Sequence, residues 1–368
     1  ILGGGISGLW LLHVLKDKGF GVLLLEREAL GGTQTIASQG MIHGGQRYML
    51  RAKSSGHAES VAQLPYRWDA CFAGRGEIDL SAVRILSPTQ VMWSAGGPLA
   101  KFALIGAAHT LTAKMRKLSE FEVPPALAHV RCAPVYELPE KVVDTASLVN
   151  CLSASHRNQI SKGCVDQLSA EGSITVSGQT IRAQLVICAA GLGNEVFLSL
   201  LGAGKSRSQR RPLRQFMVKP MPFPLYGHGI GTGYKPRVTV TSFPLSCGGY
   251  VWYIGGALAD STLALSEEKA VAFAKTEMKS LFRHLDWTNK VWATWFGSRA
   301  ESADPSGGLP NGPVVQEYGR TLVVWPTKLT LVPALSDMVL ACIKRRDVRP
   351  SYHGLSLPEL DLEYPEPA

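Results

Sequence analysis

The chain has 368 residues, of which 45% are hydrophobic and 18% are charged, and its formal net charge is +9. Because a single core stops growing at about 250–300 residues, this length predicts two domains. Lys101, Lys328 and Asp337 interrupt the most apolar regions, which argues against an integral membrane protein. The seven cysteines are scattered and form no CxxC pair, which argues against a disulfide framework or a metal site and favours a reducing, cytoplasmic location. The positive charge suits an acidic substrate, a phospholipid surface or nucleic acid without choosing among them.

The chain begins with a glycine-rich loop, Gly3-Gly4-Gly5-Ile6-Ser7-Gly8, that is typical of dinucleotide binding. Gly3 permits a tight turn after a strand, Gly5 lets the backbone approach a pyrophosphate, and Gly8 lets the following helix lie against the sheet. The N-terminus of that helix favours phosphate groups, and Glu26, which closes the next apolar run, can accept hydrogen bonds from both ribose hydroxyls. This loop therefore predicts a nucleotide cofactor.

The first strand is short, and a second α/β passage follows much later in the chain. Only Ile1 and Leu2 precede the glycines, whereas a strand takes about five residues, so we expect residues upstream and make no prediction about a targeting signal. Asp144 is expected to cap a helix, and residues 163–181 indicate a hairpin. The run 184–191 ends in small residues and predicts a buried parallel strand whose tip is approached closely by another group, such as the same nucleotide.

Between and after these parts the pattern changes to that of an α+β domain. Residues 237–241 and 250–254 are β-branched and aromatic, as is typical of antiparallel strands. A helix is predicted from about Ser266, and a last helix is predicted with Pro333 at its first position. Basic residues gather within ten positions, which we interpret as a solvated loop or, alternatively, an anion site: Lys205, Arg207, Arg210, Arg211 and Arg214.

The stretch 3–50 resembles the FAD-dependent D-amino-acid oxidase (DAO) superfamily and, within it, the glycerol-3-phosphate dehydrogenase branch. The closer resemblance is carried by the segment His43-Gly44-Gly45-Gln46-Arg47-Tyr48. Cys188-Ala189-Ala190-Gly191 and the segment 325–330 are similar to the family's second nucleotide-contacting strand and its flavin-edge motif. Arg299 lies where the family has a substrate-binding arginine, although Ala300 replaces the usual proline and Pro326-Thr327 replaces a glycine pair.

The resemblance implies an α/β FAD-binding domain that is Rossmann-like and of the glutathione-reductase type, with a second α+β substrate domain built on a mainly antiparallel sheet. The FAD-binding domain is expected to comprise 1–65, 142–203 and 297–368, and the substrate domain 66–141 and 204–296. We expect noncovalent FAD, held by Gly3, Gly5, Ile6, Ser7, Gly8, Glu26, Arg27, Gln34, Ser38, His43, Gly44, Gly45, Val165, Ala189, Ala190, Gly191, Lys328, Leu329 and Thr330.

The candidate catalytic residues are His43, Arg47, Tyr48, Arg299 and Lys328. The two arginines either clamp a carboxylate or phosphate or form ordinary ion pairs. Lys328 stabilises charge at the flavin edge, touches substrate or is a surface lysine. His43 is a general base, an attachment point for flavin or a noncovalent neighbour of it, and we favour the last. Tyr253 either reaches the substrate or is a half-buried strand tyrosine.

These features predict an enzyme that oxidises a CH–OH or CH–NH group of a small anion by hydride transfer to flavin. The substrate is a hydroxy acid, an amino acid or a polyol phosphate. One alternative is an amino-acid or secondary-amine oxidase. Another is a flavoprotein that binds a membrane or a nucleic acid through the basic segment 205–214, although no aromatic residues among these cations favour nucleic acid. Oxygen, a quinone and a partner protein all stay open as the electron acceptor.

Overall fold

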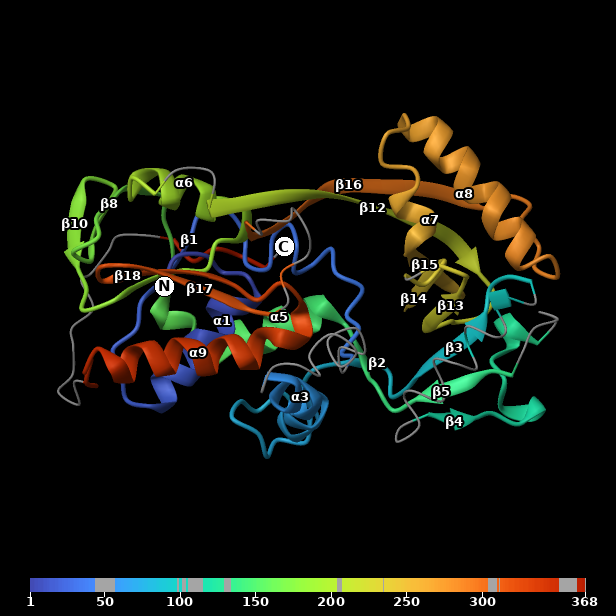
Figure 1. Cartoon of the computed structure of the whole chain (residues 1–368), viewed down its shortest axis with the longest axis horizontal. Coiled ribbons are helices and arrows are strands. Elements are labelled where there is room, and N and C mark those ends of the chain that lie inside the picture. Colours follow the sequence, from blue (N-terminus) through green and yellow to red (C-terminus); the bar gives the residue numbers. More distant parts are fainter. Residues whose placement is uncertain are drawn as a thin grey trace.

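The computed structural model describes residues 1–43, 57–97, 99–100, 104, 115–128, 134–203, 207–233, 235–303, 310, 312–350 and 363–367. These residues form two lobes that are joined by a pair of long antiparallel strands, β12 (Ser208–Met221) and β16 (Val291–Ser302) (Figure 1). Among the described residues no helix is both long enough and apolar enough to cross a membrane.

The first lobe is built on a mainly parallel sheet that contains the N-terminal glycine loop. Leu2 forms parallel bridges to Leu25 and Cys188 and so joins two groups of strands. The resulting order is β7 (Ile160–Lys162), β1 (Leu24–Glu26), Leu2, β11 (Val186–Cys188), β18 (Thr321–Trp325) and β17 (Val314–Tyr318), of which only β17 runs antiparallel to its neighbour. The predicted strand within 184–191 is therefore present and parallel.

Each face of this sheet is covered by a different kind of layer. Helices α1 (Ile6–Asp17), α5 (Thr145–Ala154) and α9 (Val332–Arg345) share one core with Ile187 and Leu322. The antiparallel strands β8 (Val165–Leu168), β9 (Ser173–Val176) and β10 (Gln179–Arg182) share another core with the sheet residues Leu25, Val186, Cys188 and Val323. Adjacent strand residues enter opposite cores because side chains alternate along a strand.

Helix ends agree closely with the local sequence signals. Asp144 caps α5 by accepting hydrogen bonds from the amides of Ala146 and Ser147, and Ser266 caps α8 (Glu267–Leu281) by accepting one from Lys269. The helix starts predicted from these residues are confirmed. The last helix begins one residue earlier than predicted, at Val332, so that Pro333 occupies its second position, where a missing amide proton is still tolerated.

The second lobe contains an eight-stranded sheet. Its order is β16, β12, β15 (Tyr250–Gly255), β14 (Val238–Pro244), β13 (Gly227–Ile230), β3 (Gln90–Ser94), β5 (Tyr136–Leu138) and β4 (Arg116–Lys117). All neighbouring strands are antiparallel except β13 and β3. The antiparallel strands predicted within 237–241 and 250–254 are thus confirmed.

The strands at the centre of this sheet have one apolar face and one polar face. On the helix face, Phe216, Val218, Trp252 and Ile254 pack in one core with Ala270, Ala274 and Met278 of α8, while α7 (Ala257–Asp260) lies beside them (Figure 1). On the opposite face, which we call the polar face, strand alternation and register place Gln215, His228, Thr239, Thr241 and Tyr253. The polar face is the one that meets the first lobe.

The remaining elements connect the two lobes or cover their edges. They are α3 (His57–Phe72), β2 (Ile85–Ser87), β6 (Val142–Val143), α6 (Asn194–Leu200) and the short 3₁₀ turns η2 (Glu120–Glu122), η3 (Pro125–Leu127), η4 (Arg157–Gln159), η5 (Gly191–Gly193) and η7 (Leu329–Leu331). β2 and β6 pair with each other, and α3 packs against the first lobe through Trp68 and Cys71.

The prediction that the basic segment 205–214 is a solvated loop is wrong for its described part. From Ser208 onward the segment is strand β12, and its cations point to different sides. Arg210 pairs with Glu195, whereas Arg211 pairs with the buried Glu301. Arg214 is buried, donates to the Leu265 carbonyl and lies 5.2 Å from the centroid of the Phe296 ring. Strand alternation disperses a cluster that is contiguous only in sequence, and Lys205 lies outside the described residues.

Candidate active site

Three of the four glycines of the N-terminal loop, Gly3, Gly5 and Gly8, have different surroundings. Gly3 has φ +110°, and a Cβ there would lie 2.6 Å from the Ala190 Cα. A Cβ on Gly8 would lie 1.9 Å from the Gly3 carbonyl oxygen, so both glycines are required by the packing of the protein itself. Gly5 has φ −75°, and its Cβ would meet only Thr35 Oγ1, at 3.4 Å. The space in front of Gly5 is therefore available to a ligand.

The start of α1 next to this space offers groups that suit an anion. Gly5 is the N-cap of α1 and provides no side-chain cap, while the Ile6 amide donates to Thr35 Oγ1 at 3.1 Å. Amide groups at the first turn and the helix dipole both favour a phosphate there. The chain also buries the Ser7 side chain in this turn.

Glu26 lies beside the loop, at the end of β1. Its Oε2 accepts a 2.6 Å hydrogen bond from the Gly4 amide and its Oε1 accepts a 2.9 Å hydrogen bond from the Glu28 amide. A carboxylate oxygen has further acceptor capacity, so both remain able to accept from hydroxyl groups. Arg27, which the sequence assigns to the cofactor, is exposed and forms an ion pair with Glu28.

The small residues after β11 contact the glycine loop directly. The Ala189 amide donates to the Leu2 carbonyl at 2.7 Å, and the Ala190 backbone lies against Gly3. Asn194 fixes this tip, because its Oδ1 accepts from the Ala190 amide at 3.0 Å and its Nδ2 donates to the Val324 carbonyl at 3.0 Å. The close approach expected at this tip is therefore made by the backbone of the loop itself.

Gln34 and Val165 complete the residues assigned to the cofactor on this side. Gln34 Oε1 accepts a 3.1 Å hydrogen bond from the Ala300 amide and faces Gly191, which has φ +57°. Val165 begins β8 and packs against the core below the sheet. Gln34 thus links the first lobe to strand β16. Val165 is held in the antiparallel sheet of β8, β9 and β10.

The segment after Gln34 joins the two lobes and contains a buried group without a partner. Gln39 accepts a 2.8 Å hydrogen bond from Thr239 Oγ1 and donates to the Tyr253 carbonyl at 2.9 Å. The Tyr253 hydroxyl donates to the Ala37 carbonyl at 3.0 Å, so Tyr253 has the structural role that was one of its two interpretations. Ser38 Oγ is buried and makes no hydrogen bond to any described residue. Such a group is normally satisfied by a ligand or water.

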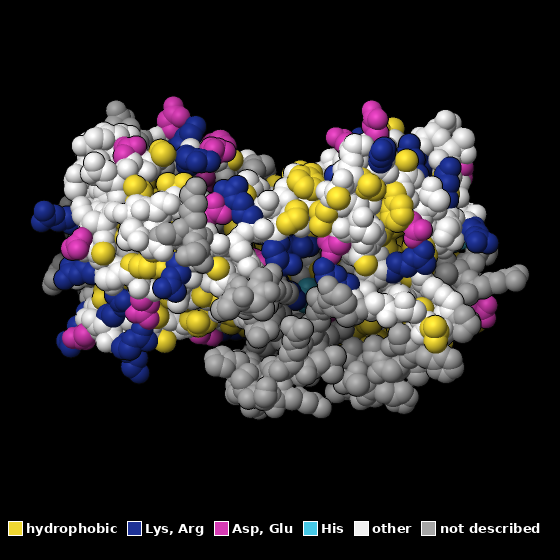
Figure 2. All heavy atoms as spheres, turned by 45° about the horizontal axis from the view of Figure 1, so that its top comes forward, with side chains coloured by type: hydrophobic (Ala, Val, Ile, Leu, Met, Phe, Trp, Pro, Cys, Tyr) yellow, Lys and Arg dark blue, Asp and Glu magenta, His cyan; other side chains and the backbone are white. Residues whose placement is uncertain are grey.

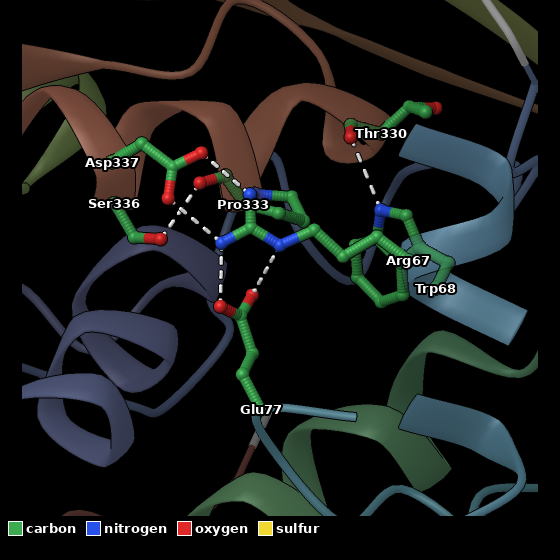
Figure 3. Close-up of polar contacts among 7 residues, drawn as sticks. All are labelled: Arg67, Trp68, Glu77, Thr330, Pro333, Ser336 and Asp337. Carbon is green, nitrogen blue, oxygen red and sulfur yellow. Dashed lines mark hydrogen bonds and ion pairs between the residues drawn. The ribbon is translucent and has the colours of Figure 1, made fainter. Parts of the chain in front are cut away.

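His43 lies next to the C-terminal motif. Its amide donates to Thr330 Oγ1 at 3.2 Å, and the Trp68 ring nitrogen donates to the Thr330 carbonyl at 3.1 Å (Figure 3). Burial, the Lys328 charge and His228 lower the pKa of His43 to about 3, which makes it a neutral imidazole at pH 7. Thr330 therefore brings His43 close to Lys328.

An ion-pair cluster holds the elements that carry this motif. Arg67 of α3 donates to both carboxylate oxygens of Glu77 and to both of Asp337 in α9, and the Ser336 hydroxyl donates to the Pro333 carbonyl beside it (Figure 3). The planar guanidinium suits such forked pairing. This cluster fixes α3 against the start of α9, directly after Thr330.

Arg299 projects from the polar face of β16. It is half-buried and forms no hydrogen bond or ion pair with any described residue. Burial lowers its pKa, which Arg211 also lowers while Asp260 and Glu301 raise it. Both of these carboxylates already have cationic partners, because Asp260 pairs with Lys235 and Glu301 with Arg211, each at 2.5 Å. The Arg299 guanidinium is therefore available to an anion.

Three residues that the sequence did not single out also belong to the polar face. Gln215 Oε1, Thr241 Oγ1 and His228 Nδ1 are buried and make no hydrogen bond to any described residue. Alternation within one strand cannot place these residues, because the pairing of β12, β15, β14 and β13 is needed to bring the three onto one face. Unpaired buried polar atoms on one face indicate a site for a polar ligand.

Figure 2 shows a hollow between the two lobes, with Lys and Arg side chains at its edge and a histidine side chain inside it. The residues present fit the FAD that the resemblance implies, because Gly5 leaves room for a pyrophosphate, α1 starts without a cap and Ser38 Oγ needs a partner. Gly44, Gly45, Arg47 and Tyr48 of the predicted site lie outside the described residues.

Comparisons with known proteins agree with this arrangement. A family model described as FAD dependent oxidoreductase (DAO) matches residues 1–335. The chain is 38% identical to the probable FAD-dependent oxidoreductase PA4991 of Pseudomonas aeruginosa, over 98% of this chain and 94% of that protein. The crystal structure of PA4991 superposes with a TM-score of 0.85 and covers 100% of this chain and 94% of that one.

More distant structures share the fold. L-α-glycerophosphate oxidase from Mycoplasma pneumoniae, with FAD bound, has a TM-score of 0.62 at 14% identity and covers 93% of each chain. L-amino acid deaminase from Proteus vulgaris has a TM-score of 0.68 at 14% identity, over 94% of this chain and 88% of that one. The family expected from the N-terminal motifs is confirmed: this chain is an FAD-dependent oxidoreductase and belongs to the DAO family.

Proposed function

We propose that FAD lies along the glycine loop in a Rossmann-like domain of the glutathione-reductase type and is bound noncovalently. Gly5 and the first turn of α1 hold the pyrophosphate, and Glu26 accepts hydrogen bonds from the ribose. Ser38 Oγ, whose buried oxygen has no partner among the described residues, hydrogen-bonds the cofactor. His43 and Lys328 lie beside the isoalloxazine ring. The open space at Gly5 supports this placement most directly.

The division into domains follows the two cores. Trp68, Cys71, Ile78, Leu80 and Val83 pack in the same core as α1. We therefore propose that the FAD-binding domain extends from 1 to about residue 83, and not only to residue 65. It also contains 142–203 and 297–368, and the substrate domain contains the eight-stranded sheet.

Substituting Gly5→Val tests the position of the cofactor. The new Cβ meets only Thr35 Oγ1 at 3.4 Å, so the protein is expected to fold while the side chain occupies the pyrophosphate space. We expect colourless, folded protein. Gly97→Val is the matched control, because a Cβ there meets nothing within 4 Å, and it should retain one FAD per chain. Stoichiometric FAD in Gly5→Val would place the cofactor elsewhere.

The enzyme oxidises the hydroxyl-bearing carbon of a small anion, such as a hydroxy acid. The observation that carries this proposal is the half-buried guanidinium of Arg299 on the polar face, which has no partner in the described part of the chain. An ammonium group would need a carboxylate partner, yet the carboxylates near Arg299 are already paired with Lys235 and Arg211. A site with free positive charge and no free carboxylate among its described residues favours an anion with a neutral hydroxyl group.

The FAD, when bound, supplies the acceptor for the hydride that leaves the substrate carbon. Arg299 binds the substrate's carboxylate or phosphate in a forked pair, which fixes the direction of the rest of the molecule. Lys328 holds positive charge close to His43, and this charge favours negative charge in the same region. Gln39 and Tyr253 hold the two lobes in register around the site.

Anaerobic addition of candidate substrates to the FAD-bound protein tests this assignment. The panel contains hydroxy acids, the corresponding amino acids and glycerol 3-phosphate, and the readout is loss of the oxidised-flavin absorbance. We expect at least one hydroxy acid to bleach the flavin much faster than its amino-acid counterpart. Faster bleaching by an amino acid would instead establish an amine oxidase.

The described pairings of the basic segment do not favour the alternative of a membrane or nucleic-acid partner. Arg210 and Arg211 are engaged in ion pairs with Glu195 and Glu301, and Arg214 is buried. Charges held in this way do not form one basic surface. A small substrate remains the better-supported partner.

A further inference from the structure

His228 is a partly exposed histidine of the polar face whose ring atom Nδ1 is buried, and the residues proposed above for cofactor and substrate binding do not include it. It lies on β13, opposite Thr239 of β14 and Met92 of β3. It is close enough to His43 for its charge to lower the pKa of the His43 imidazole. His228 therefore lies at the border between the substrate sheet and the residues that adjoin the flavin.

Its neighbours determine which ring nitrogen carries the hydrogen. The side-chain nitrogen of Gln90 donates to the Lys141 carbonyl at 3.4 Å, which turns the Gln90 carbonyl oxygen toward His228. This oxygen lies 2.9 Å from His228 Nε2. Because an amide oxygen only accepts hydrogen bonds, Nε2 must donate, and Nδ1 is left with a free lone pair. Gln90 is fully buried, so its side chain is held in place by the surrounding residues.

The lone pair of Nδ1 has no partner within the described part of the chain, and the atom is buried. Burial also lowers the pKa of His228 to about 4, which keeps the ring unprotonated at neutral pH. Among the described residues, the charged groups that act on the protonation of His43 are Lys328 and His228, and neither supplies a negative charge. His228 is thus a neutral imidazole whose Nδ1 lone pair can accept a hydrogen bond or a proton.

We propose that His228 is a catalytic base, whose Nδ1 accepts the hydroxyl proton of the substrate during its oxidation. This inference rests on the proposed oxidation of a hydroxy acid. The O–H bond breaks and its proton moves to Nδ1, while the electron pair of that bond becomes the second bond of the carbonyl group. The C–H bond breaks in the same oxidation, and its hydride is taken by FAD, which is the oxidant. The imidazolium then returns its proton to solvent.

His43 is the less suitable base of the two. Its pKa is lowered further, to about 3, in part by the positive charge of Lys328. A proton gained by His43 would therefore lie beside a cation, whereas the pKa of His228 is lowered by burial alone. Catalysis by a base is most effective when its pKa approaches the working pH.

The test compares His228→Gln with His156→Gln in the FAD-bound protein. Glutamine at position 228 can still donate to Gln90 but has no basic nitrogen, whereas His156 lies in the first lobe with its ring against His13. With a hydroxy acid that bleaches the wild-type flavin, we expect His228→Gln to slow flavin reduction by about 100-fold or more, as for loss of a general base. The pH dependence at the acidic side should disappear with it. FAD content and hydroxy-acid binding, followed by the flavin spectrum, should stay at wild-type values, and His156→Gln should change neither rate nor pH profile.

Unchanged reduction kinetics in His228→Gln would overturn the proposal while leaving the hydroxy-acid assignment intact. If no hydroxy acid bleaches the wild-type flavin, the proposed function itself fails, which is a different result. A second readout needs no turnover: ¹⁵N NMR of the histidines should show His228 with hydrogen on Nε2 and none on Nδ1. Gln90→Leu should abolish this preference, because Gln90 is a positioning residue. Hydrogen on Nδ1 in the wild-type protein would contradict the assignment.

Discussion

The two faces of the eight-stranded sheet are made by the same strands but are built for different purposes. Trp252 and Tyr253 are neighbours in β15, yet the first packs against Phe282 on the helix face and the second bonds to Ala37 of the FAD-binding lobe. The helix face satisfies its residues by close packing. The polar face leaves buried atoms of Gln215, Thr241 and His228 without a hydrogen-bond partner among the described residues.

This difference indicates that residues of the helix face mainly stabilise the fold, whereas residues of the polar face mainly serve function. An unpaired buried polar group lowers stability by about 1–3 kcal/mol, so several on one face are not explained by folding. Proteins break such rules mostly at functional sites. The predictions below test whether stability depends on the helix face and function on the polar face.

The largest loss of stability is expected for Trp252→Ala. Trp252 is fully buried, its ring lies 5.2 Å from Phe282, and its indole nitrogen donates to the Phe223 carbonyl at 2.8 Å. Removing it should lower the free energy of unfolding by about 3–5 kcal/mol, as for other large-to-small changes in cores. Urea unfolding followed by circular dichroism measures this change. A loss below about 1 kcal/mol would mean that the helix face is not the main core of this lobe.

Acid should destabilise the protein through the polar face. Burial lowers the pKa of His228 to about 4 in the fold from its ordinary value of 6.5, so the unfolded chain binds this proton more readily. Stability is therefore complete above about pH 6.5 and falls as the pH is lowered toward 4, at about 1.4 kcal/mol per pH unit for this group. Urea unfolding of the wild type and His228→Gln at several pH values should give a smaller slope for the variant. Identical slopes would show that His228 is not held neutral in the fold.

A small effect is expected for Tyr253→Phe. The substitution removes only the hydroxyl that donates to Ala37 at 3.0 Å and leaves the ring in place. The free energy of unfolding should fall by about 1 kcal/mol, which is the usual contribution of one hydrogen bond. The matched contrast is Trp252→Ala at the adjacent position. If Tyr253→Phe cost as much as Trp252→Ala, the two faces would not differ in the way described.

Much of this fold follows from local sequence signals. Asp144 and Ser266 cap helices because their side chains can accept backbone hydrogen bonds, and these signals need no knowledge of distant contacts. The family of the chain was also predictable from its glycine loop and the segments around His43 and Lys328. Thr327 replaces a family glycine and still adopts φ +61°, so the backbone keeps its path despite the substitution.

The sequence was less informative where pairing between strands decides the outcome. The cations before residue 214 are adjacent in the chain, yet β12 directs Arg211 and Arg214 to opposite faces. His228 stood out in no motif, because its environment comes from β3, β13 and the carbonyl of Lys141. Such sites depend on long-range register, which periodicity within one segment does not contain.

The central claim is that the polar face binds the substrate anion through Arg299, and Arg299→Lys tests it most directly. Lysine keeps the charge but loses the forked geometry, so kcat/KM for the active hydroxy acid should fall by an amount equivalent to about 1.5–3 kcal/mol, with FAD content unchanged. The control is Arg210→Lys on the neighbouring strand, where the side chain is 57% exposed and pairs with Glu195. The account predicts a loss at Arg299 and little change at Arg210; an unchanged kcat/KM in Arg299→Lys, or equal losses in both variants, would contradict it.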